Sequence, residues 1–280
     1  MQLILKDWHD PALFRSHVES FLGEREAENN LVFGILAGVI DGRQKFSDEP
    51  PLLASVEAET GVQLVGLRTP PLNVVLSTAR SEEAVALLAR ELWAAGHRLP
   101  GVTAPSREAK IFAEAWSQIS GAPIRQEHSQ RIYLLDRVNP PRPTAGHLHL
   151  CDERDLVLAT EWMRAFNRDV GEHQVPGDPR RFIGQREAGL FFWIDDRPVS
   201  MAGFSGPTPN GIRIGAVYTP PELRGRGFAS ACVAAVSQRL LNEGRKFCFL
   251  YTDLANPTSN HIYQEIGYRP VCDASVLAFE

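Results

Sequence analysis

A basic, glycine-containing turn in the last quarter of the sequence is well suited to bind an anion. The apolar run 212–218 has the composition of a strand and is stopped by Pro220 and Pro221. The turn Arg-Gly-Arg-Gly-Phe-Ala follows at 224–229, and an alanine-rich segment with helical periodicity comes next. Backbone amides at a helix N-terminus bind phosphate, and small residues let the anion approach the chain. The sequence therefore predicts a phosphate site between this strand and this helix.

Two common phosphate-binding motifs fit this turn poorly. A Walker loop requires Gly-Lys-Ser/Thr after its glycines, and these residues are absent here. A dinucleotide fingerprint fits only in part, because Ser230 stands where the third glycine belongs. That fingerprint also opens a βαβ unit, and we expect too little chain after the turn to complete a Rossmann sheet.

A second group of polar residues follows at helical spacing. Asn256 or Thr258 can cap a helix, and Asn260 and Tyr263 then fall on its successive turns. Gly267 is expected to end this helix in a left-handed conformation, before a final strand. The sequence thus predicts strand, phosphate-binding turn, helix, strand and a polar helix in this order.

These two motifs together resemble those of the GCN5-related N-acetyltransferases, the GNAT superfamily, which bind acetyl-CoA. The pattern Arg224-x-x-Gly227-x-Ala229 resembles the pyrophosphate loop, and Asn-x-x-Ser-Asn-x-x-Tyr-x-x-x-Gly-Tyr at 256–268 resembles the last helix of the family. The resemblance implies acetyl-CoA as cofactor and Tyr263 as the general acid that protonates the departing thiolate. The cofactor-binding residues that it implies are Val217, Tyr218, Thr219, Arg224, Gly225, Arg226, Gly227, Phe228, Ala229, Ser230, Asn256, Ser259, Asn260 and Tyr263.

The resemblance also implies that residues 217–219 pair with the pantetheine arm and that the Val217 amide faces the thioester oxygen. It leaves the general base open, because family members often carry a glutamate on the strand before the turn and residues 212–218 contain no carboxylate. Glu172 and His173 are the catalytic candidates for this role, since they precede the segment where the family builds its acceptor pocket. Asp253 and a chain of water molecules are alternatives.

Composition favours a folded protein without a nucleic-acid or membrane function. The chain has 280 residues, 44% of them hydrophobic, and a net charge of −5. That charge gives no basis for a nucleic-acid surface, and no apolar run approaches the roughly 18 residues of a membrane span. Four scattered cysteines without a CxxC pair, and no signal peptide, predict a cytoplasmic protein with no metal site. We expect a monomer or a homodimer.

A proline-rich segment predicts two domains. Residues 140–143 contain three prolines, which can continue neither a helix nor a sheet. The predicted domains are 1–137 and 146–280, with a linker at 138–145. In the second domain we expect a helix at 178–187 and a last strand at 271–279. With the resemblance, the expected fold class is α/β (α+β): two tandem acyl-CoA N-acyltransferase-like domains, each a mixed, mostly antiparallel sheet flanked by helices.

The N-terminal half has a similar order of predicted strands and helices but lacks the residues proposed to bind CoA and to protonate the thiolate. Thr-Pro-Pro at 69–71 echoes Thr-Pro-Pro at 219–221, and the segment 101–105 precedes a helix through Phe112. No glycine-arginine turn follows, and Phe112 has no hydroxyl where a tyrosine is expected. This half is predicted to be a degenerate GNAT-like domain that does not bind CoA productively, or an unrelated α/β domain.

Four functions remain to be compared. The favoured one is an acetyl-CoA-dependent N-acetyltransferase that acts on a primary amine of a small molecule or peptide by direct attack in a ternary complex. A non-catalytic acyl-CoA-binding sensor is favoured by the missing strand carboxylate, whereas Tyr263 favours the enzyme. A transferase of a longer acyl group is a third possibility, and an NAD-dependent oxidoreductase lacks the sheet that it needs.

Overall fold

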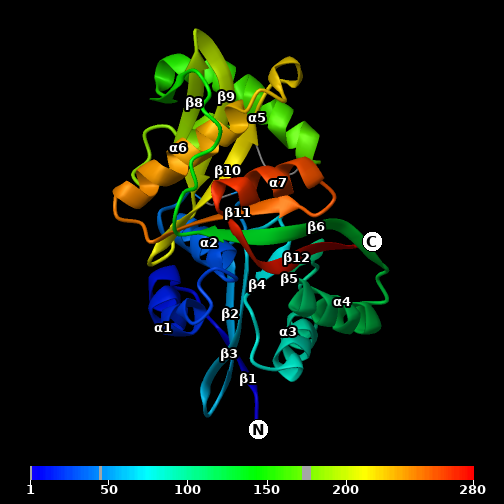
Figure 1. The fold of residues 1–280 in the computed structure, drawn as a ribbon. Helices are drawn as coiled ribbons and strands as arrows, with labels where there is room; N and C mark the ends of the chain where they lie inside the picture. The colour runs from blue at the N-terminus through cyan, green and yellow to red at the C-terminus, as the bar shows by residue number, and fades with distance from the viewer. Residues whose placement is uncertain (1, 44–45, 172–177) are drawn as a thin grey trace. The chain divides into compact units, whose positions relative to one another are not determined.

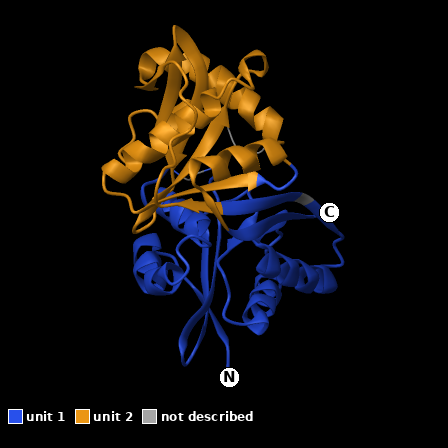
Figure 2. Ribbon diagram, in the orientation of Figure 1, with its two compact units in different colours: residues 1–132, 253–255, 271–280 blue, residues 133–252, 256–270 orange. Residues whose placement is uncertain are grey.

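The computed structural model describes residues 2–43, 46–171 and 178–280 (Figure 1). They form two compact units, which Figure 2 distinguishes by colour. Unit 1 contains the residues up to 132 together with 253–255 and 271–280, and unit 2 contains 133–252 and 256–270. These units differ from the predicted domains, because the end of the chain belongs to unit 1. The predicted boundaries at 137 and 146 therefore stay a prediction.

Unit 1 is a sheet with helices on both faces. Its strands follow the order β1-β2-β3-β4-β5-β12-β6. Its elements are β1 (Ile4–Asp7), α1 (Pro11–Gly23), α2 (Asn30–Ile40), β2 (Leu52–Ala58), β3 (Gly61–Arg68), β4 (Val74–Leu76), α3 (Glu82–Ala94), β5 (Gly101–Pro105), α4 (Ser106–Ser120), β6 (Ile124–Leu135) and β12 (Arg269–Phe279). β4 and β5 run parallel, and β5 and β12 run antiparallel.

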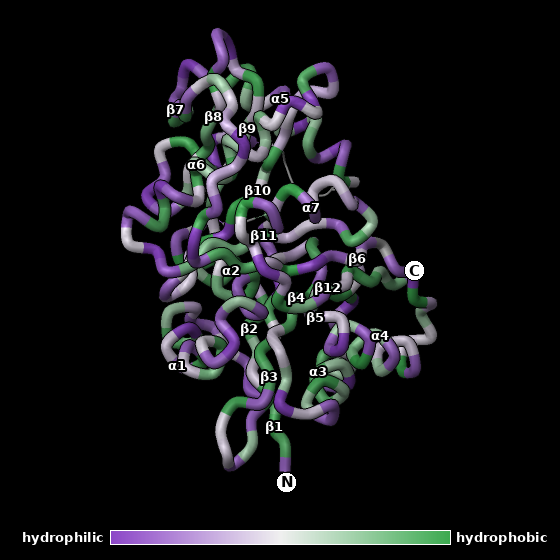
Figure 3. The backbone as a smooth tube through the Cα atoms, in the orientation of Figure 1, coloured by the Kyte–Doolittle hydropathy of each residue, from purple (hydrophilic) through white to green (hydrophobic). Residues whose placement is uncertain are grey.

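The two faces of unit 1 follow from the alternation of side chains along its strands. Leu64 of β3 joins a core with α3 and α4, whereas Val65 joins a second core with α1 and α2. α2 is apolar on nearly every side (Figure 3), and most of its residues are buried. Local signals set the helix starts: Asp10 caps α1 and Ser81 caps α3.

Unit 2 carries both sequence motifs. Its elements are β7 (His147–Leu150), α5 (Leu156–Val170), β8 (Gly189–Asp195), β9 (Arg197–Ser205), β10 (Gly211–Tyr218), α6 (Phe228–Asn242), β11 (Phe247–Asp253) and α7 (Pro257–Ile266). The strand order is β11-β10-β9-β8-β7, with β10 and β11 parallel and the remaining pairs antiparallel. β6 is the neighbour of both β11 and β12 in the strand order, and its residues from Tyr133 on belong to unit 2.

Helices also cover both faces of the sheet in unit 2. Phe191 and Trp193 of β8 pack into a core with α6 and α7. Leu190 and Phe192, which alternate with them, pack into a core with α5. The mixed, mostly antiparallel sheets flanked by helices confirm the predicted fold class. Among the residues described, no helix is both long and apolar enough to span a bilayer.

Two predictions of secondary structure and pairing are wrong. The expected helix at 178–187 is a single 3-10 turn, Pro179–Arg181, and Gly184 has a φ of 74°, which a right-handed helix does not allow. The last strand was expected to complete the C-terminal domain. Instead β12 pairs with β5, with Val276 opposite Thr103. A strand pattern shows which side chains are buried but does not specify the partner strand.

The pairing of β12 with unit 1 predicts the effect of truncating one of its core side chains. Leu277 packs with Phe112 and Trp116 in the core beneath α3 and α4. Leu277→Ala should lower the free energy of unfolding by about 2–4 kcal/mol and accelerate amide hydrogen exchange in α3 and α4. Leu250→Ala, in the core of unit 2, is the matched control and should accelerate exchange in α6 and α7 instead. Faster exchange of α6 in Leu277→Ala, with α4 unchanged, would contradict the pairing.

Candidate functional site

A bulge in β10 changes which face of the sheet its side chains occupy. Gly215 pairs with Gly203 and Tyr218 with Met201, so three steps along β10 match two along β9. Ala216 takes the extra step with a φ of 49°, a conformation that non-glycine residues rarely adopt. Ile214, before the bulge, packs into the core with α6 and α7. Ala216, at the bulge, packs into the core with α5 on the other face.

The bulge lies where β10 separates from β11. The two strands are paired over Gly211–Arg213 and Phe247–Phe249, and no pairing between them is found beyond Arg213 along the described strands. The backbone groups of β10 from Ile214 to Tyr218 that point toward β11 are therefore not used by that strand. An extended polar ligand can pair with such an edge by main-chain hydrogen bonds.

The predicted phosphate turn follows directly after β10. A 3-10 turn, Pro221–Leu223, is anchored by the buried side chain of Leu223. Gly225 and Gly227 have φ values of 76° and 80°, which glycine adopts without strain. α6 begins at Phe228 without a side-chain cap, and its first intrahelical bond to Gly227 comes from the Ala231 amide. The preceding amides, those of residues 228–230, are those that a helix N-terminus offers to an anion.

The two arginines of the turn have different environments. The Arg224 guanidinium contacts the Asp169 carboxylate at 2.6 Å and donates to the Thr219 carbonyl at 2.9 Å. Arg226 is exposed and forms no ion pair with any residue that the structure describes. The turn is basic as predicted, but the charge of Arg224 is largely balanced by Asp169. Arg226 and the helix amides are thus the groups that would attract an anion.

The polar helix α7 has the predicted caps. Asn256 accepts a hydrogen bond from the Ser259 amide at 3.0 Å, and Gly267, with a φ of 110°, ends the helix. Both predictions are confirmed. Asn256 is therefore engaged as a cap, and Ser259 contributes its amide to that cap.

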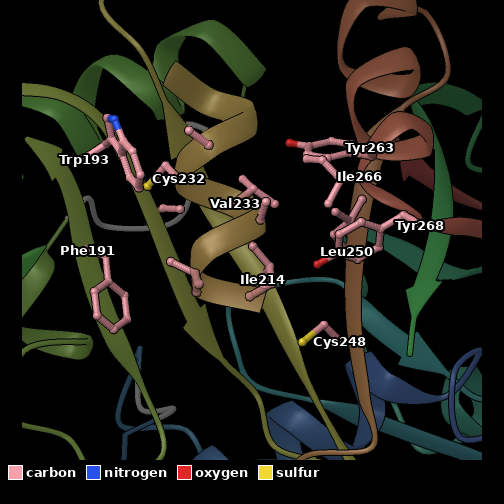
Figure 4. Packing of buried hydrophobic residues seen from close by; sticks show 14 of the residues in the cluster. Phe191, Trp193, Ile214, Cys232, Val233, Cys248, Leu250, Tyr263, Ile266 and Tyr268 are labelled. Carbon is pink, nitrogen blue, oxygen red and sulfur yellow. The ribbon is translucent and has the colours of Figure 1, made fainter. Parts of the chain in front are cut away.

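Tyr263 lies on the buried face of α7. Only 8% of its surface is exposed, and its ring packs against Tyr268 at 6.0 Å between centroids. Figure 4 shows the phenol extending from α7 toward α6. Its hydroxyl has no protein hydrogen-bond partner within the described parts of the chain. Burial raises the pKa of Tyr263 to about 12, so the phenol keeps its proton throughout the physiological range.

Asn260 is tied into a network that the sequence did not reveal. Its Oδ1 accepts from the Tyr133 hydroxyl at 3.0 Å, and its Nδ2 donates to the Asn256 carbonyl at 2.8 Å. Gln264 donates to the same Tyr133 hydroxyl at 3.1 Å. Tyr133 lies in β6, far away in sequence, and no local pattern connects it with α7. Thr144 of the predicted linker also lies close to the phosphate turn, and no local pattern in the sequence predicts this. Its Oγ1 would be only 3.1 Å from a Cβ added at Gly227.

The candidates for the general base are not brought together with these residues. Glu172 and His173 lie outside the described residues. Asp253 accepts a hydrogen bond from the Ala255 amide at 2.8 Å, as a turn carboxylate does. The described residues thus combine free amides at a helix start, a strand edge that β11 does not pair with and a buried phenol.

The cysteines are all free, and Cys232 and Cys248 are buried. Burial raises the pKa of the Cys248 thiol to about 12, which makes it a poor nucleophile. No cluster of three or more His, Cys, Asp or Glu side chains suited to a metal occurs in the described ranges.

Unit 1 repeats the strand and helix order of this site without its open turn. β4 and β5 are parallel like β10 and β11, and α3 follows β4 as α6 follows β10. The Thr78 amide in the intervening loop donates to Asn29 Oδ1 at 2.9 Å, and the Ala79 amide donates to Glu108 Oε1 at 3.2 Å. Glu108 is only 5% exposed. A carboxylate of the chain itself therefore accepts the hydrogen bond of a loop amide in unit 1.

The topology also refines the comparison of the two halves. Thr-Pro-Pro at 69–71 lies between β3 and β4, whereas its counterpart at 219–221 follows β10, so these triplets do not occupy equivalent positions. Phe112 and Tyr263, in contrast, are each the seventh residue of their helices, α4 and α7. The missing hydroxyl in unit 1 thus falls at the equivalent position.

Comparison with known proteins agrees with this topology. Residues 197–276 match the family model "FR47-like protein". A search of curated protein sequences finds no significant match. Among solved structures, a Drosophila protein aligns over 100% of this chain and 99% of its own (TM-score 0.69, 10% identity). A tandem GNAT protein from the clavulanic acid biosynthesis pathway aligns over 100% and 98% (TM-score 0.58, 15% identity).

A third solved structure, a GCN5-related N-acetyltransferase from Sphaerobacter thermophilus, aligns over 99% of this chain and 95% of its own, with a TM-score of 0.59 and 15% identity. At such low identities these likenesses concern the fold. They extend over both units, and the family model covers the turn and α7. The chain therefore has a fold similar to that of two-domain GNAT proteins, with an FR47-like segment at residues 197–276.

Proposed function

We propose that this protein is an N-acetyltransferase that moves an acetyl group from acetyl-CoA to a primary amine of a small molecule or peptide, by direct attack in a ternary complex. One observation carries the proposal. β10 leaves β11 after Arg213, and the free edge leads directly to the uncapped start of α6 at Gly227. The pantetheine arm of acetyl-CoA would match the free edge of β10, and the pyrophosphate that follows the arm would match the start of α6.

The residues of the site fit acetyl-CoA. Main-chain groups of β10 from Val217 to Thr219 would pair with the pantetheine arm. The amides of 225–230 and the Arg226 side chain would hold the pyrophosphate, and two glycines leave room for its oxygens. Bound acetyl-CoA supplies the activated acyl group as a thioester. The Asn260 carboxamide is bonded to Tyr133 and Asn256, so its contribution to binding the cofactor would be small.

The transfer needs one bond formed and one broken. The amine nitrogen attacks the thioester carbonyl, the C–S bond breaks, the amine loses a proton and the thiolate gains one. The Val217 amide would donate to the oxyanion, and Tyr263 would donate to the leaving sulfur. A phenol with a pKa of about 12 is a weaker acid than a thiol, whose pKa is about 8.5. Tyr263 thus contributes chiefly by hydrogen bonding to the developing thiolate, and the thiolate takes its proton from solvent while the amine proton passes to the base.

Proton removal from the amine is assigned to Glu172 or His173 as part of this proposal. An amine that arrives neutral needs little assistance, so the reaction does not depend on a carboxylate in β10. The absence of that carboxylate favours the second candidate function, a sensor that binds acyl-CoA without turnover. Measurement of acyl transfer separates the two, because both functions require binding.

The turn assignment predicts the effect of a charge at Gly227. In calorimetry the parent protein should bind one acetyl-CoA per chain, since the corresponding loop of unit 1 is occupied by Glu108. Gly227→Glu places a carboxylate beside the pyrophosphate and should abolish measurable binding. Gly244→Glu is the matched control: it introduces the same charge at another positive φ, 100°, at the other end of α6, with open space around it. Equal affinities of the two variants would contradict the assignment.

The proposed role of Tyr263 predicts a selective loss of rate. Tyr263→Phe removes the hydrogen bond to the leaving sulfur and should lower kcat by about 100-fold or more, with little change in acetyl-CoA affinity. Steady-state kinetics together with calorimetry measure both effects. An unchanged kcat would exclude Tyr263 from the reaction.

The raised pKa of Tyr263 predicts the alkaline side of the pH profile. The folded-state pKa is raised, so the neutral phenol persists above the pH at which an exposed tyrosine, with a pKa near 10, would ionise. At saturating substrates, kcat should show no decline between about pH 8 and about pH 10. A falling limb within that range, lost in Tyr263→Phe, would show that the phenol ionises at a lower pH than its burial implies.

A further inference from the structure

Tyr133 connects β6 with the helix that carries Tyr263. Its side chain is fully buried in the core of unit 2, and its hydroxyl is placed between two side chains of α7. The hydroxyl donates to Asn260 Oδ1 at 3.0 Å and accepts from Gln264 Nε2 at 3.1 Å. Asn260 and Gln264 are four residues apart, so they lie on one face of the helix, and Tyr263 lies between them in sequence.

This network ties two successive turns of α7 to β6. One phenol hydroxyl uses its donor on one turn of the helix and its acceptor on the next. Asn260 adds a third bond, from Nδ2 to the Asn256 carbonyl at the start of α7. Tyr133 is fully buried, whereas Asn260 is half-buried and Gln264 is exposed. The cost of losing these bonds therefore falls mainly on the Tyr133 hydroxyl, which water cannot readily reach. α7 has only 10 residues, so its helical bonds alone hold it weakly in place.

We infer that Tyr133 is a positioning residue for acyl transfer: through Asn260 and Gln264 it orients α7, and thereby sets where the Tyr263 hydroxyl lies. The inference rests on the proposed function. A small rotation of α7 displaces the hydroxyl at the end of the long Tyr263 side chain. Catalytic groups displaced by about 1 Å lose up to about 100-fold in rate. Tyr133 itself does not touch the reacting atoms in this account.

Tyr133→Phe tests the inference, because it removes the hydroxyl and keeps the ring. We expect kcat to fall by about 10-fold to 100-fold, while KM for acetyl-CoA changes by less than about twofold. Tyr268→Phe is the matched control. Its hydroxyl is buried and bonds to Ser237 Oγ at 2.8 Å on α6, and the substitution keeps the ring that packs against Tyr263. Both variants should lower Tm by a few degrees, on the order of 2–4 °C, but only Tyr133→Phe should lower kcat.

A double variant shows whether Tyr133 acts through Tyr263. Once the Tyr263 hydroxyl is absent, its position no longer matters, so Tyr133→Phe with Tyr263→Phe should be no slower than Tyr263→Phe alone. Multiplied losses would overturn the inference, and so would equal kcat losses in Tyr133→Phe and Tyr268→Phe.

Hydrogen exchange provides a readout that is independent of turnover. The amides of α7 should exchange faster in Tyr133→Phe than in Tyr268→Phe, and equal exchange in the two variants would overturn the inference. A parent protein that transfers no acyl group would contradict the proposed function. The control of α7 by Tyr133 would then still be decided by this exchange measurement.

Discussion

The bulge at Ala216 is the constraint on which the candidate site depends. A strand that continued in regular register would keep pairing with β11 and would use the main-chain groups that a ligand needs. One extra residue in β10 switches its side chains to the other face, next to the point where pairing with β11 ends at Arg213. A positive φ at a non-glycine residue costs on the order of 1–2 kcal/mol. The cores on both faces, which bury Ile214 and Ala216, hold the strand in this conformation.

The two units show how one topology supports different chemistry. Both place a loop and a helix after the inner of two parallel strands. In unit 2 the loop contains two glycines and leads to an uncapped helix. In unit 1 Asn29 and Glu108 accept from the loop amides, Ser81 caps the helix, and Phe112 replaces the tyrosine. Unit 1 has thus satisfied internally the groups that unit 2 leaves free. This contrast explains why only one anion site per chain is expected.

Features with local signals were predictable from the sequence. The turn at 224–229, the cap at Asn256 and the left-handed Gly267 each depend on residues within a few positions of one another, and all three lie as expected. Features that depend on distant residues were not predictable. The partner of β12, the Asp169–Arg224 ion pair and the contact of Tyr133 with Asn260 join segments far apart in the chain. The helix predicted at 178–187 does not form, because Gly184 has a positive φ and the helical periodicity of this segment is weak.

The central claim is that acetyl-CoA binds along β10 and across the start of α6. Nuclear magnetic resonance of the isotopically labelled protein, titrated with acetyl-CoA, tests this claim residue by residue. We predict that the amide signals of 217–219 and 225–230 shift together, with a single saturating affinity, while those of the unit 1 loop at 77–81 stay in place. Unshifted signals at 225–230, or shifts confined to other segments, would contradict the account.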